Sequence, residues 1–288
     1  MSYNDHRGIA VQEPSRSASY GIRDREMGSD ALAFHAERIR TIGHSVLDSG
    51  MSQQDVDRLG TSLDAILERQ VQEFGGVERL ANIGDADTVR CPLVYDDRFV
   101  GLVRHPMLLR LCRRVLGDYV QLMQQNGLVN QSGDTHPQRA YHRDLPYQHF
   151  VSSRPLALSA LFCIDPFRVE TGATTVLPAS HLSERFPSDD VAASLETPIE
   201  AAPGTFIVFD SMLFHRAGVN RSGRPRRAVN QVFTVPIIAQ QISLPAALHG
   251  RFADDPELAQ LLGYEAVPAA SVAEWRERRL ARAMASRT

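Results

Sequence analysis

Seven short segments between residues 120 and 236 have a strand-like pattern, and they place the strongest constraint on the fold. They are rich in β-branched and aromatic side chains and are separated by Gly, Pro, Ser and Asp, which is the pattern of strands joined by turns. Many short strands after a helical segment predict a β-sandwich or jelly roll with helices packed on its outside. The predicted strands are Val120–Asn130, Arg139–Asp144, Leu156–Ile164, Thr174–Leu177, Thr197–Glu200, Thr205–Asp210 and Arg226–Pro236.

The segment before these strands is predicted to be mainly helical. Asp30 and Ser52 are suitable N-caps for helices that run to about Ile42 and Gln72, and each is followed by apolar residues at helical spacing. A third helix is expected from Met107 to Leu116, with a proline in its first turn and a glycine after its end.

We expect one domain in residues 29–288, because no linker divides the strands into two cores. Residues 1–28 are polar and are predicted to form a flexible arm, and the jelly-roll core is expected over residues 119–236. A basic helix is predicted over residues 271–282, packed on the body through Trp275 and Leu280.

A possible metal site begins with His142 and Asp144. On an extended strand, side chains two residues apart point to the same face, so one cation can contact both. His215, after a later apolar run, is the candidate third ligand. Two histidines and one carboxylate with open positions form the facial triad of non-haem Fe(II) oxygenases.

Arg226 follows the candidate third ligand, His215, by eleven residues. The Gly- and Pro-bearing segment after His215 predicts a hairpin that places Arg226 beside it. A guanidinium matches a carboxylate in a partly desolvated site, so Arg226 is a candidate partner for a 2-oxo acid with a second carboxylate. Arg227 alternates to the opposite face and is expected to be structural.

The composition excludes several other classes of function. The formal net charge of −3 argues against a nucleic-acid or membrane-surface partner. No apolar run reaches the length of a membrane span, and three cysteines without metal-ligand spacing suit a reduced compartment, so we expect a cytoplasmic protein. The expected partner is a small molecule, and the chain is expected to be a monomer or homodimer.

Several motifs occur in an order that resembles the phytanoyl-CoA dioxygenase family of Fe(II)- and 2-oxoglutarate-dependent oxygenases. They are Tyr141–Asp144, Glu170–His181, Pro203–Thr205 and the segment His215–Arg226, and the resemblance covers about residues 119–236. It implies a mainly β fold with flanking helices, built on a double-stranded β-helix, the cupin-like form of the jelly roll.

The resemblance also implies the site and the chemistry. It assigns His142, Asp144 and His215 as iron ligands with catalytic roles, and Arg226 as the partner of the distal 2-oxoglutarate carboxylate, with Asn130 as a further contact. Fe(II), 2-oxoglutarate and O2 are the implied cofactors, with ascorbate as a candidate reductant. The implied reaction is hydroxylation, or another oxidation of an unactivated C–H bond, in a small metabolite of secondary or specialised metabolism.

Two departures from the family pattern affect this assignment. Tyr141 stands where an aromatic residue, often Trp, precedes the His-x-Asp pair, and Ala217 replaces a small hydroxyl residue that some members use toward the co-substrate.

The substrate is not identified by the sequence. The segment after Asp144 carries the candidate substrate-binding residues, which are Tyr147, Gln148 and His149, with Arg139 before it. Desaturation and ring formation stay open as outcomes. Two other functions also stay open: a jelly-roll metalloenzyme that works without 2-oxoglutarate, as an isomerase or hydrolase, and a non-catalytic binding protein on the same fold.

Overall fold

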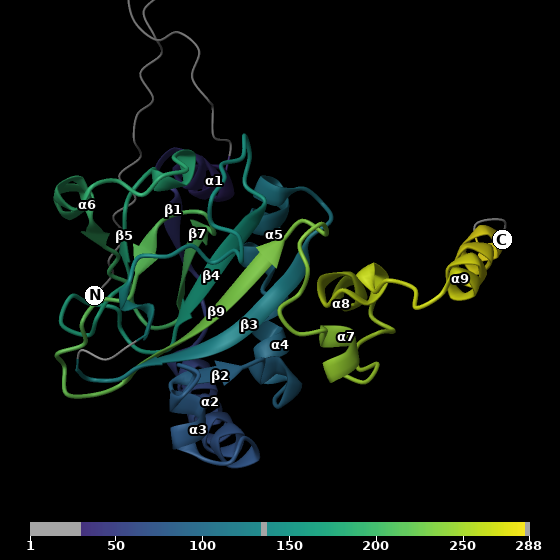
Figure 1. Cartoon of the computed structure of the whole chain (residues 1–288), viewed down its shortest axis with the longest axis horizontal. Coiled ribbons are helices and arrows are strands. Elements are labelled where there is room, and N and C mark those ends of the chain that lie inside the picture. The colour runs from purple at the N-terminus through teal and green to yellow at the C-terminus, as the bar shows by residue number, and fades with distance from the viewer. Residues whose placement is uncertain (1–29, 134–136, 286–288) are drawn as a thin grey trace, which may run out of the picture.

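The computed structural model describes residues 30–133 and 137–285 and shows an antiparallel β core flanked by helices (Figure 1). The predicted arm, residues 1–28, lies outside the described residues. Within the described ranges, no helix has the length and hydropathy needed to cross a bilayer.

The main sheet has six strands in the order β1-β7-β4-β9-β3-β2, and every neighbouring pair is antiparallel. The central strands β4 and β9 are buried along almost their whole length, which explains why their sequences read as continuous apolar runs rather than as alternating ones. The strands are β1 His44–Asp48, β2 Thr88–Arg90, β3 Gln121–Asn130, β4 Ala157–Cys163, β7 Thr205–Asp210 and β9 Arg226–Thr234.

A smaller sheet has three strands in the order β6-β5-β8. These are β5 Thr175–Val176, β6 Thr197–Pro198 and β8 His215–Arg216. A buried cluster joins the two sheets, with Ile207 and Phe209 from β7 and Val176 from β5 among its members. The candidate site lies beside this cluster, because β8 begins with His215.

Helices pack on the main sheet through a larger apolar cluster, with Ile39, Leu63 and Leu108 among its buried members. The predicted caps are confirmed: the side chain of Asp30 accepts from the Ala33 amide, and that of Ser52 accepts from the Asp55 amide. The α-helices are α1 Ala31–Ile42, α2 Gln53–Glu73, α3 Val77–Ala81, α4 Arg98–Val103, α5 Pro106–Leu116, α6 Asp189–Leu195, α7 Leu244–Ala247, α8 Pro256–Leu261 and α9 Val272–Ala285. Short 3-10 helices span Pro92–Val94, Pro137–Arg139, Ser180–Leu182 and Tyr264–Ala266.

The predicted strand Arg139–Asp144 is wrong. A 3-10 helix occupies Pro137–Arg139, and the only β contact of the segment is an isolated antiparallel bridge between His142 and His215. Prolines on both sides of the motif restrict regular pairing. The sequence also failed to indicate β1, an edge strand whose hydrogen bonds come from β7, more than 150 residues later in the chain.

The predicted hairpin between His215 and Arg226 is also wrong. β8 pairs with β5 in the small sheet, whereas β9 pairs with β3 and β4 in the main sheet. Residues 217–225 therefore carry the chain from one sheet to the other. The side-chain amide of Asn220 holds this crossing by donating to the carbonyls of Asn130 and Arg224 over 2.8 and 2.7 Å.

The C-terminal helix forms but does not pack as predicted. α9 extends from Val272 to Ala285 and stands away from the rest of the chain (Figure 1). Trp275 and Leu280, the expected packing contacts, are 52% and 55% exposed. Arginines between its apolar residues prevent a continuous apolar stripe of the kind that packs a helix on a core.

Candidate active site

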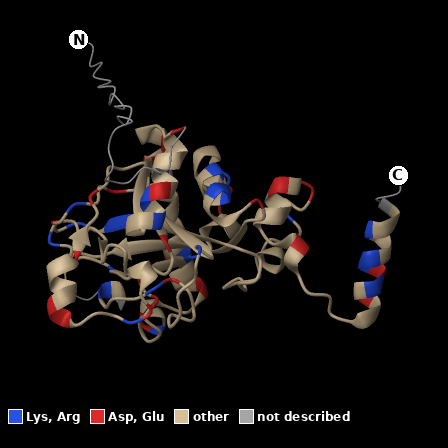
Figure 2. Cartoon of the chain, turned by 90° about the horizontal axis from the view of Figure 1, so that it is seen from above, with Lys and Arg blue, Asp and Glu red and all other residues tan. Residues whose placement is uncertain are grey.

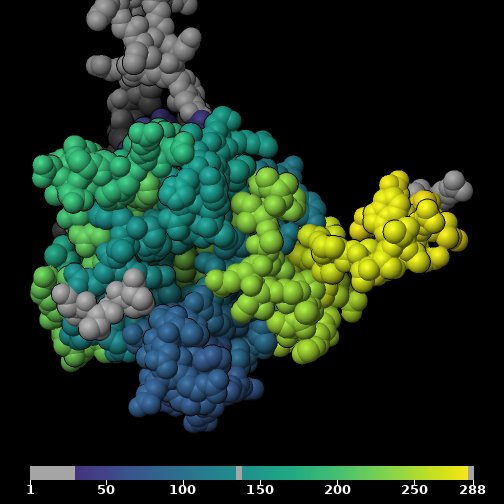
Figure 3. Space-filling model, in the orientation of Figure 1, coloured from purple at the N-terminus to yellow at the C-terminus, as the bar shows by residue number. Residues whose placement is uncertain are grey.

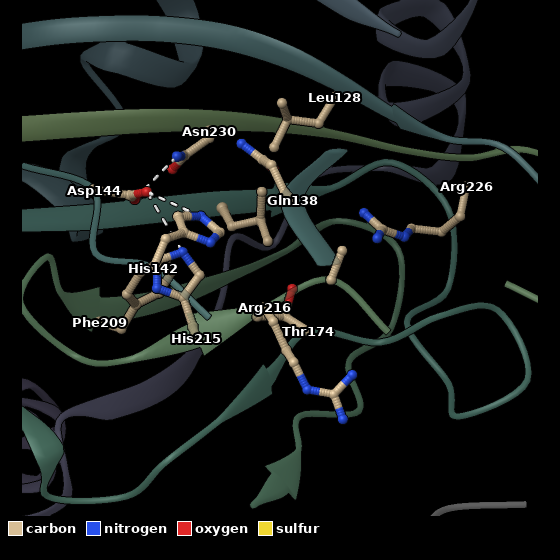
Figure 4. Close-up of a pocket in the computed structure, with 12 residues that line it drawn as sticks. Leu128, Gln138, His142, Asp144, Thr174, Phe209, His215, Arg216, Arg226 and Asn230 are labelled. Atoms are coloured by element: carbon tan, nitrogen blue, oxygen red, sulfur yellow. Dashed lines mark hydrogen bonds and ion pairs between the residues drawn. The ribbon is translucent and has the colours of Figure 1, made fainter. Parts of the chain in front are cut away.

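Three side chains with metal-ligating atoms converge where the two sheets meet. His142, Asp144 and His215 each offer one such atom, and these atoms lie within 4.8 Å of one another. Oδ1 of Asp144 is 3.4 Å from Nε2 of His215 and 3.9 Å from Nε2 of His142. The bridge between His142 and His215 brings the two imidazoles together, with ring centroids 4.3 Å apart (Figure 4).

Backbone carbonyls fix the tautomer of both imidazoles. Nδ1 of His142 donates to the Ala140 carbonyl, and Nδ1 of His215 donates to the Leu213 carbonyl, each over 3.0 Å. A neutral ring held in this way presents the lone pair of Nε2 to the common centre. Nε2 of His142 is buried and has no hydrogen-bond partner, which fits a metal ion as its missing neighbour.

Asp144 uses its two carboxylate oxygens differently. Oδ1 faces the imidazoles, whereas Oδ2 accepts from the Ser159 hydroxyl at 2.5 Å and from the Asn230 side-chain amide at 3.2 Å. Burial raises the pKa of this carboxyl. The two imidazoles and the Ser159 hydroxyl have the larger, opposite effect, so the pKa lies well below its usual value. Burial, together with His215, lowers the pKa of His142. Asp144 therefore presents a carboxylate and His142 a neutral imidazole, which are the forms that bind metal, whereas, against the effect of burial, the Asp144 carboxylate raises the pKa of His215.

Arg226 is a buried cation without an acidic partner among the described residues. It is 4% exposed, one terminal nitrogen donates to the Gly172 carbonyl over 3.1 Å, and its guanidinium lies 4.1 Å from the Phe167 ring centroid. Its Nε has no hydrogen-bond partner. Burial lowers the pKa of Arg226 to about 10. Since an unpaired charge is costly to bury, the site is suited to receive an anion such as a carboxylate.

One cavity connects the triad with Arg226. Figure 4 shows the guanidinium pointing along it toward the three ligands. Four apolar side chains line it, and the other eight lining residues are polar or charged, so the cavity is suited to polar and ionic ligands. The lining residues are Leu128, Gln138, His142, Asp144, Leu161, Thr174, Phe209, His215, Arg216, Ala217, Arg226 and Asn230.

Comparison with known proteins decides the family. The sequence model of the family described as phytanoyl-CoA dioxygenase (PhyH) matches residues 39–228. The chain belongs to the phytanoyl-CoA dioxygenase family. It is therefore an enzyme of the non-haem iron, 2-oxoglutarate-dependent oxygenase class, and iron and 2-oxoglutarate are the metal and co-substrate of that class.

Two relatives in sequence are similar to different lengths of the chain. The uncharacterized protein Rv1501 of Mycobacterium tuberculosis is 32% identical over 217 residues, which are 74% of this chain and 78% of that protein. The iron/alpha-ketoglutarate-dependent dioxygenase penM of Penicillium thymicola is 31% identical over 121 residues, which are 39% of this chain and 36% of that protein.

Two solved structures show the same fold at low sequence identity. The non-haem monooxygenase ThoJ has a TM-score of 0.59 and 19% identity, over 72% of this chain and 80% of that chain. The alpha ketoglutarate-dependent epimerase SnoN from nogalamycin biosynthesis has a TM-score of 0.53 and 21% identity, over 72% of this chain and 83% of that chain.

Asn130 lies next to Arg226 but does not line the cavity. The two residues pair across β3 and β9. The Asn130 amide donates to the carbonyls of Gly172 and Gly218 over 3.4 and 3.1 Å, and its Oδ1 has no partner. Asn130 and Arg226 thus hold the same carbonyl, that of Gly172, and a direct contact of Asn130 with the co-substrate stays a prediction.

The four predicted substrate residues lie outside the cavity lining. Tyr147 and His149 are exposed, and their rings pack edge to face with centroids 5.9 Å apart. Gln148 is engaged with Arg143: its side-chain oxygen accepts from the Arg143 amide, and its carbonyl accepts from the guanidinium. Arg139 precedes the triad at the end of a 3-10 helix. The neighbouring Gln138 lines the cavity instead, and contact of these four residues with substrate stays a prediction.

Arg143, between the two ligands of the His-x-Asp motif, was not indicated by the sequence. It is 2% exposed, and its guanidinium donates to the carbonyls of Met212, Gln148, Glu184, Ser180 and Ser183. The guanidinium also lies 3.8 Å from the centroid of the Phe214 ring. One side chain thus ties the first two ligands to the loop before His215 and to the segment 180–184.

Arg216 lines the cavity but turns away from the triad (Figure 4). It donates to the Glu196 carboxylate over 2.8 Å, and the Tyr141 hydroxyl donates to the same oxygen over 2.7 Å. The charge of Arg216 is thereby balanced within the protein, which distinguishes it from Arg226. Arg227 behaves as predicted, since it points to the other face and pairs with Asp165 and Asp64.

Proposed function

We propose that His142, Asp144 and His215 bind Fe(II), that Arg226 binds the distal carboxylate of 2-oxoglutarate, and that the enzyme oxidises a C–H bond of a small molecule. The observation that carries this proposal is the shared cavity, with a pre-arranged metal trio at one place and an unpaired buried guanidinium at another. The finer outcome we favour is hydroxylation of a metabolite in specialised metabolism, on a double-stranded β-helix core within one domain of residues 29–288.

The chemistry divides between the bound groups and the protein. Bound iron and 2-oxoglutarate supply the oxidising power, with O2 as oxidant and succinate and carbon dioxide as co-products. The protein residues position the metal ligands and shield the site from water. The Ala140 and Leu213 carbonyls orient the imidazoles, and Ser159 and Asn230 hold Oδ2 of Asp144. The apolar part of the lining, Leu128, Leu161 and Phe209, limits the access of water.

The same geometry disfavours the two other functions. An isomerase or hydrolase that uses the trio alone has no need for a buried guanidinium without a counter-ion. A binding protein has no need for imidazoles held in the metal-binding tautomer. Retaining both features is costly to stability and is explained by a metal and an anionic co-substrate.

A direct test measures succinate release. With Fe(II), 2-oxoglutarate, ascorbate and a panel of small molecules, we expect the substrate to stimulate succinate formation, and we expect His142→Ala to abolish the stimulation. Succinate formation that persists at the wild-type rate in His142→Ala would contradict the assignment of the metal site. Products of the stimulating compound, analysed by mass, distinguish hydroxylation from desaturation or ring formation.

Ser159→Ala tests the support of Asp144. Without the hydroxyl, Oδ2 loses its shortest hydrogen bond, and we expect Fe(II) affinity to fall by about 10- to 100-fold, as for other residues that orient metal ligands. Metal titration of the purified variant measures this, with Ser194→Ala on the exposed side of α6 as the control. Equal affinity in the wild type and Ser159→Ala would show that Asn230 alone holds the carboxylate.

A further inference from the structure

Three side chains that line the cavity carry a buried polar atom without a hydrogen-bond partner among the described residues. These atoms are Nε2 of His142, Nε of Arg226 and Oδ1 of Asn230. A buried polar atom without a partner is costly, so each one marks a place where a bound group completes the site. The metal ion is the proposed neighbour of the first atom, and the distal carboxylate of 2-oxoglutarate is that of the second. Neither is a partner for the third.

Asp144 fixes the orientation of the Asn230 carboxamide. Asn230 lies on β9 and is 7% exposed, and its Nδ2 donates to Oδ2 of Asp144 over 3.2 Å (Figure 4). The ionised carboxylate can only accept, so the amide nitrogen must face it and the amide oxygen cannot take that place. Oδ1 is therefore an acceptor held next to a metal ligand, and the group that completes it must donate a hydrogen bond.

The groups already assigned to the cavity cannot supply that hydrogen bond. Fe(II) and O2 have no donor, and ionised 2-oxoglutarate has only acceptor oxygens. The component of the reaction that remains is the substrate. This inference therefore rests on the proposed function, in which Fe(II) occupies the trio and 2-oxoglutarate lies at Arg226.

The rest of the polar lining indicates that the donor is uncharged. The trio is assigned to the metal and Arg226 to the co-substrate, and Arg216 is already paired with a carboxylate. The polar lining residues that are left for the substrate are neutral: Gln138, Thr174 and Asn230. An ammonium group buried here would have no counter-ion of its own, so a hydroxyl or amide N–H group fits better.

Features outside the cavity do not select the substrate by charge. In Figure 2, acidic and basic side chains are interspersed over the body instead of being gathered by sign. The one helix that projects from the body, α9, contributes none of the lining residues (Figure 3). Discrimination between substrates therefore falls to the side chains of the lining.

We propose that Asn230 is a specificity-determining residue whose Oδ1 accepts a hydrogen bond from a neutral O–H or N–H group of the substrate. Because Asn230 also holds Asp144, this group lies next to the metal ligands and hence beside the C–H bond that is oxidised. The substrate class is a small alcohol or secondary amide. A site built to bond such a group rejects an analogue without it, because its own acceptor is then left unpaired.

The experiment measures the binding of matched pairs of compounds to the protein loaded with Fe(II) and 2-oxoglutarate, without oxygen, so that no turnover occurs. One member is an alcohol or secondary amide that stimulates succinate release. The other is its deoxyfluoro or ester analogue, which has a similar shape and no donor. Equilibrium dialysis gives the two dissociation constants, and we expect the donor to bind at least about tenfold more tightly in the wild type.

Two variants separate recognition of the substrate from support of Asp144. Asn230→Leu removes the acceptor at similar side-chain volume and should bring the ratio of the two dissociation constants close to one. Ser159→Ala also removes a hydrogen bond to Oδ2 of Asp144, but it leaves Oδ1 of Asn230 in place, so it should keep the wild-type ratio. A role of Asn230 confined to supporting Asp144 would leave the ratio unchanged in both variants.

Three results would overturn the proposal. The first is equal binding of both members in the wild type, which needs no variant and would mean that a water molecule satisfies Oδ1. The second is the wild-type ratio in iron-loaded Asn230→Leu, which would assign the donor to another residue. The third is succinate release stimulated only by compounds without an O–H or N–H group. Failure of the proposed function is seen separately, because the wild type would then not bind Fe(II) and 2-oxoglutarate before any pair is added.

Discussion

Asp144→Ala should reduce substrate-dependent succinate formation by more than about 100-fold, because residues that merely orient a metal ligand already cost 10- to 100-fold. Asp144 is the only carboxylate of the trio, and its ionised state balances the charge of the metal ion. Its loss also removes the acceptor for Ser159 and Asn230. The measurement is succinate release under saturating iron and 2-oxoglutarate, with bound iron determined in parallel.

Asp190→Ala is the matched control for Asp144→Ala. It removes an exposed carboxylate from the first turn of α6 and should leave turnover unchanged. Far-ultraviolet circular dichroism of both variants separates loss of iron from loss of fold. If folded Asp144→Ala binds iron stoichiometrically and keeps turnover within a few-fold of the wild type, Asp144 is not a ligand.

Arg226→Met should weaken 2-oxoglutarate binding at least about 30-fold, since truncating one partner of a buried charge pair costs about 2–5 kcal/mol. The same variant should leave the thermal stability of the co-substrate-free protein unchanged or raise it. The reason is that the guanidinium is buried without a counter-ion, and methionine removes that desolvation penalty while filling a similar volume. Calorimetric titration with 2-oxoglutarate and thermal unfolding measure the two effects.

Arg227→Met separates the two neighbouring arginines. Arg227 is paired with Asp165 and Asp64, so its loss should lower thermal stability while leaving 2-oxoglutarate affinity near the wild-type value. Arg226→Met should therefore weaken 2-oxoglutarate binding without lowering thermal stability, whereas Arg227→Met should lower thermal stability without weakening 2-oxoglutarate binding. Normal affinity in Arg226→Met would show that another residue binds the distal carboxylate.

The parts of the fold that depend on local chemistry were predictable from the sequence. The helix starts at Asp30 and Ser52 follow from caps that act within three residues. The central strands β4 and β9 follow from apolar runs of strand length. The edge strand β1 was missed because its partner β7 lies far along the chain. The sequence predicts a hairpin where the chain in fact crosses from β8 to β9, because turn residues do not reveal which sheet each flanking strand joins.

In the candidate site, too, some residues could be predicted from the sequence and others depend on distant parts of the chain. His142, Asp144 and His215 were predictable as neighbours because few residue types bind metal, and they occur in a recognisable order. Ser159 was not indicated because it lies in an apolar strand, and its role depends on β4 passing beside Asp144. Asn230 had a detectable signal: it lies four residues after Arg226, so strand alternation places both on one face. The packing of α9 was predicted wrongly, because helical spacing does not reveal what covers an apolar side chain.

The central claim is that one cavity binds Fe(II) through the trio and 2-oxoglutarate through Arg226. Anaerobic titration of the purified protein with Fe(II) and 2-oxoglutarate tests it most directly, by visible absorption. We predict a weak charge-transfer band that requires both components, saturates at one equivalent of iron, is absent in His215→Ala, and needs a higher 2-oxoglutarate concentration in Arg226→Met. Stoichiometric iron binding without such a band at any 2-oxoglutarate concentration would contradict it.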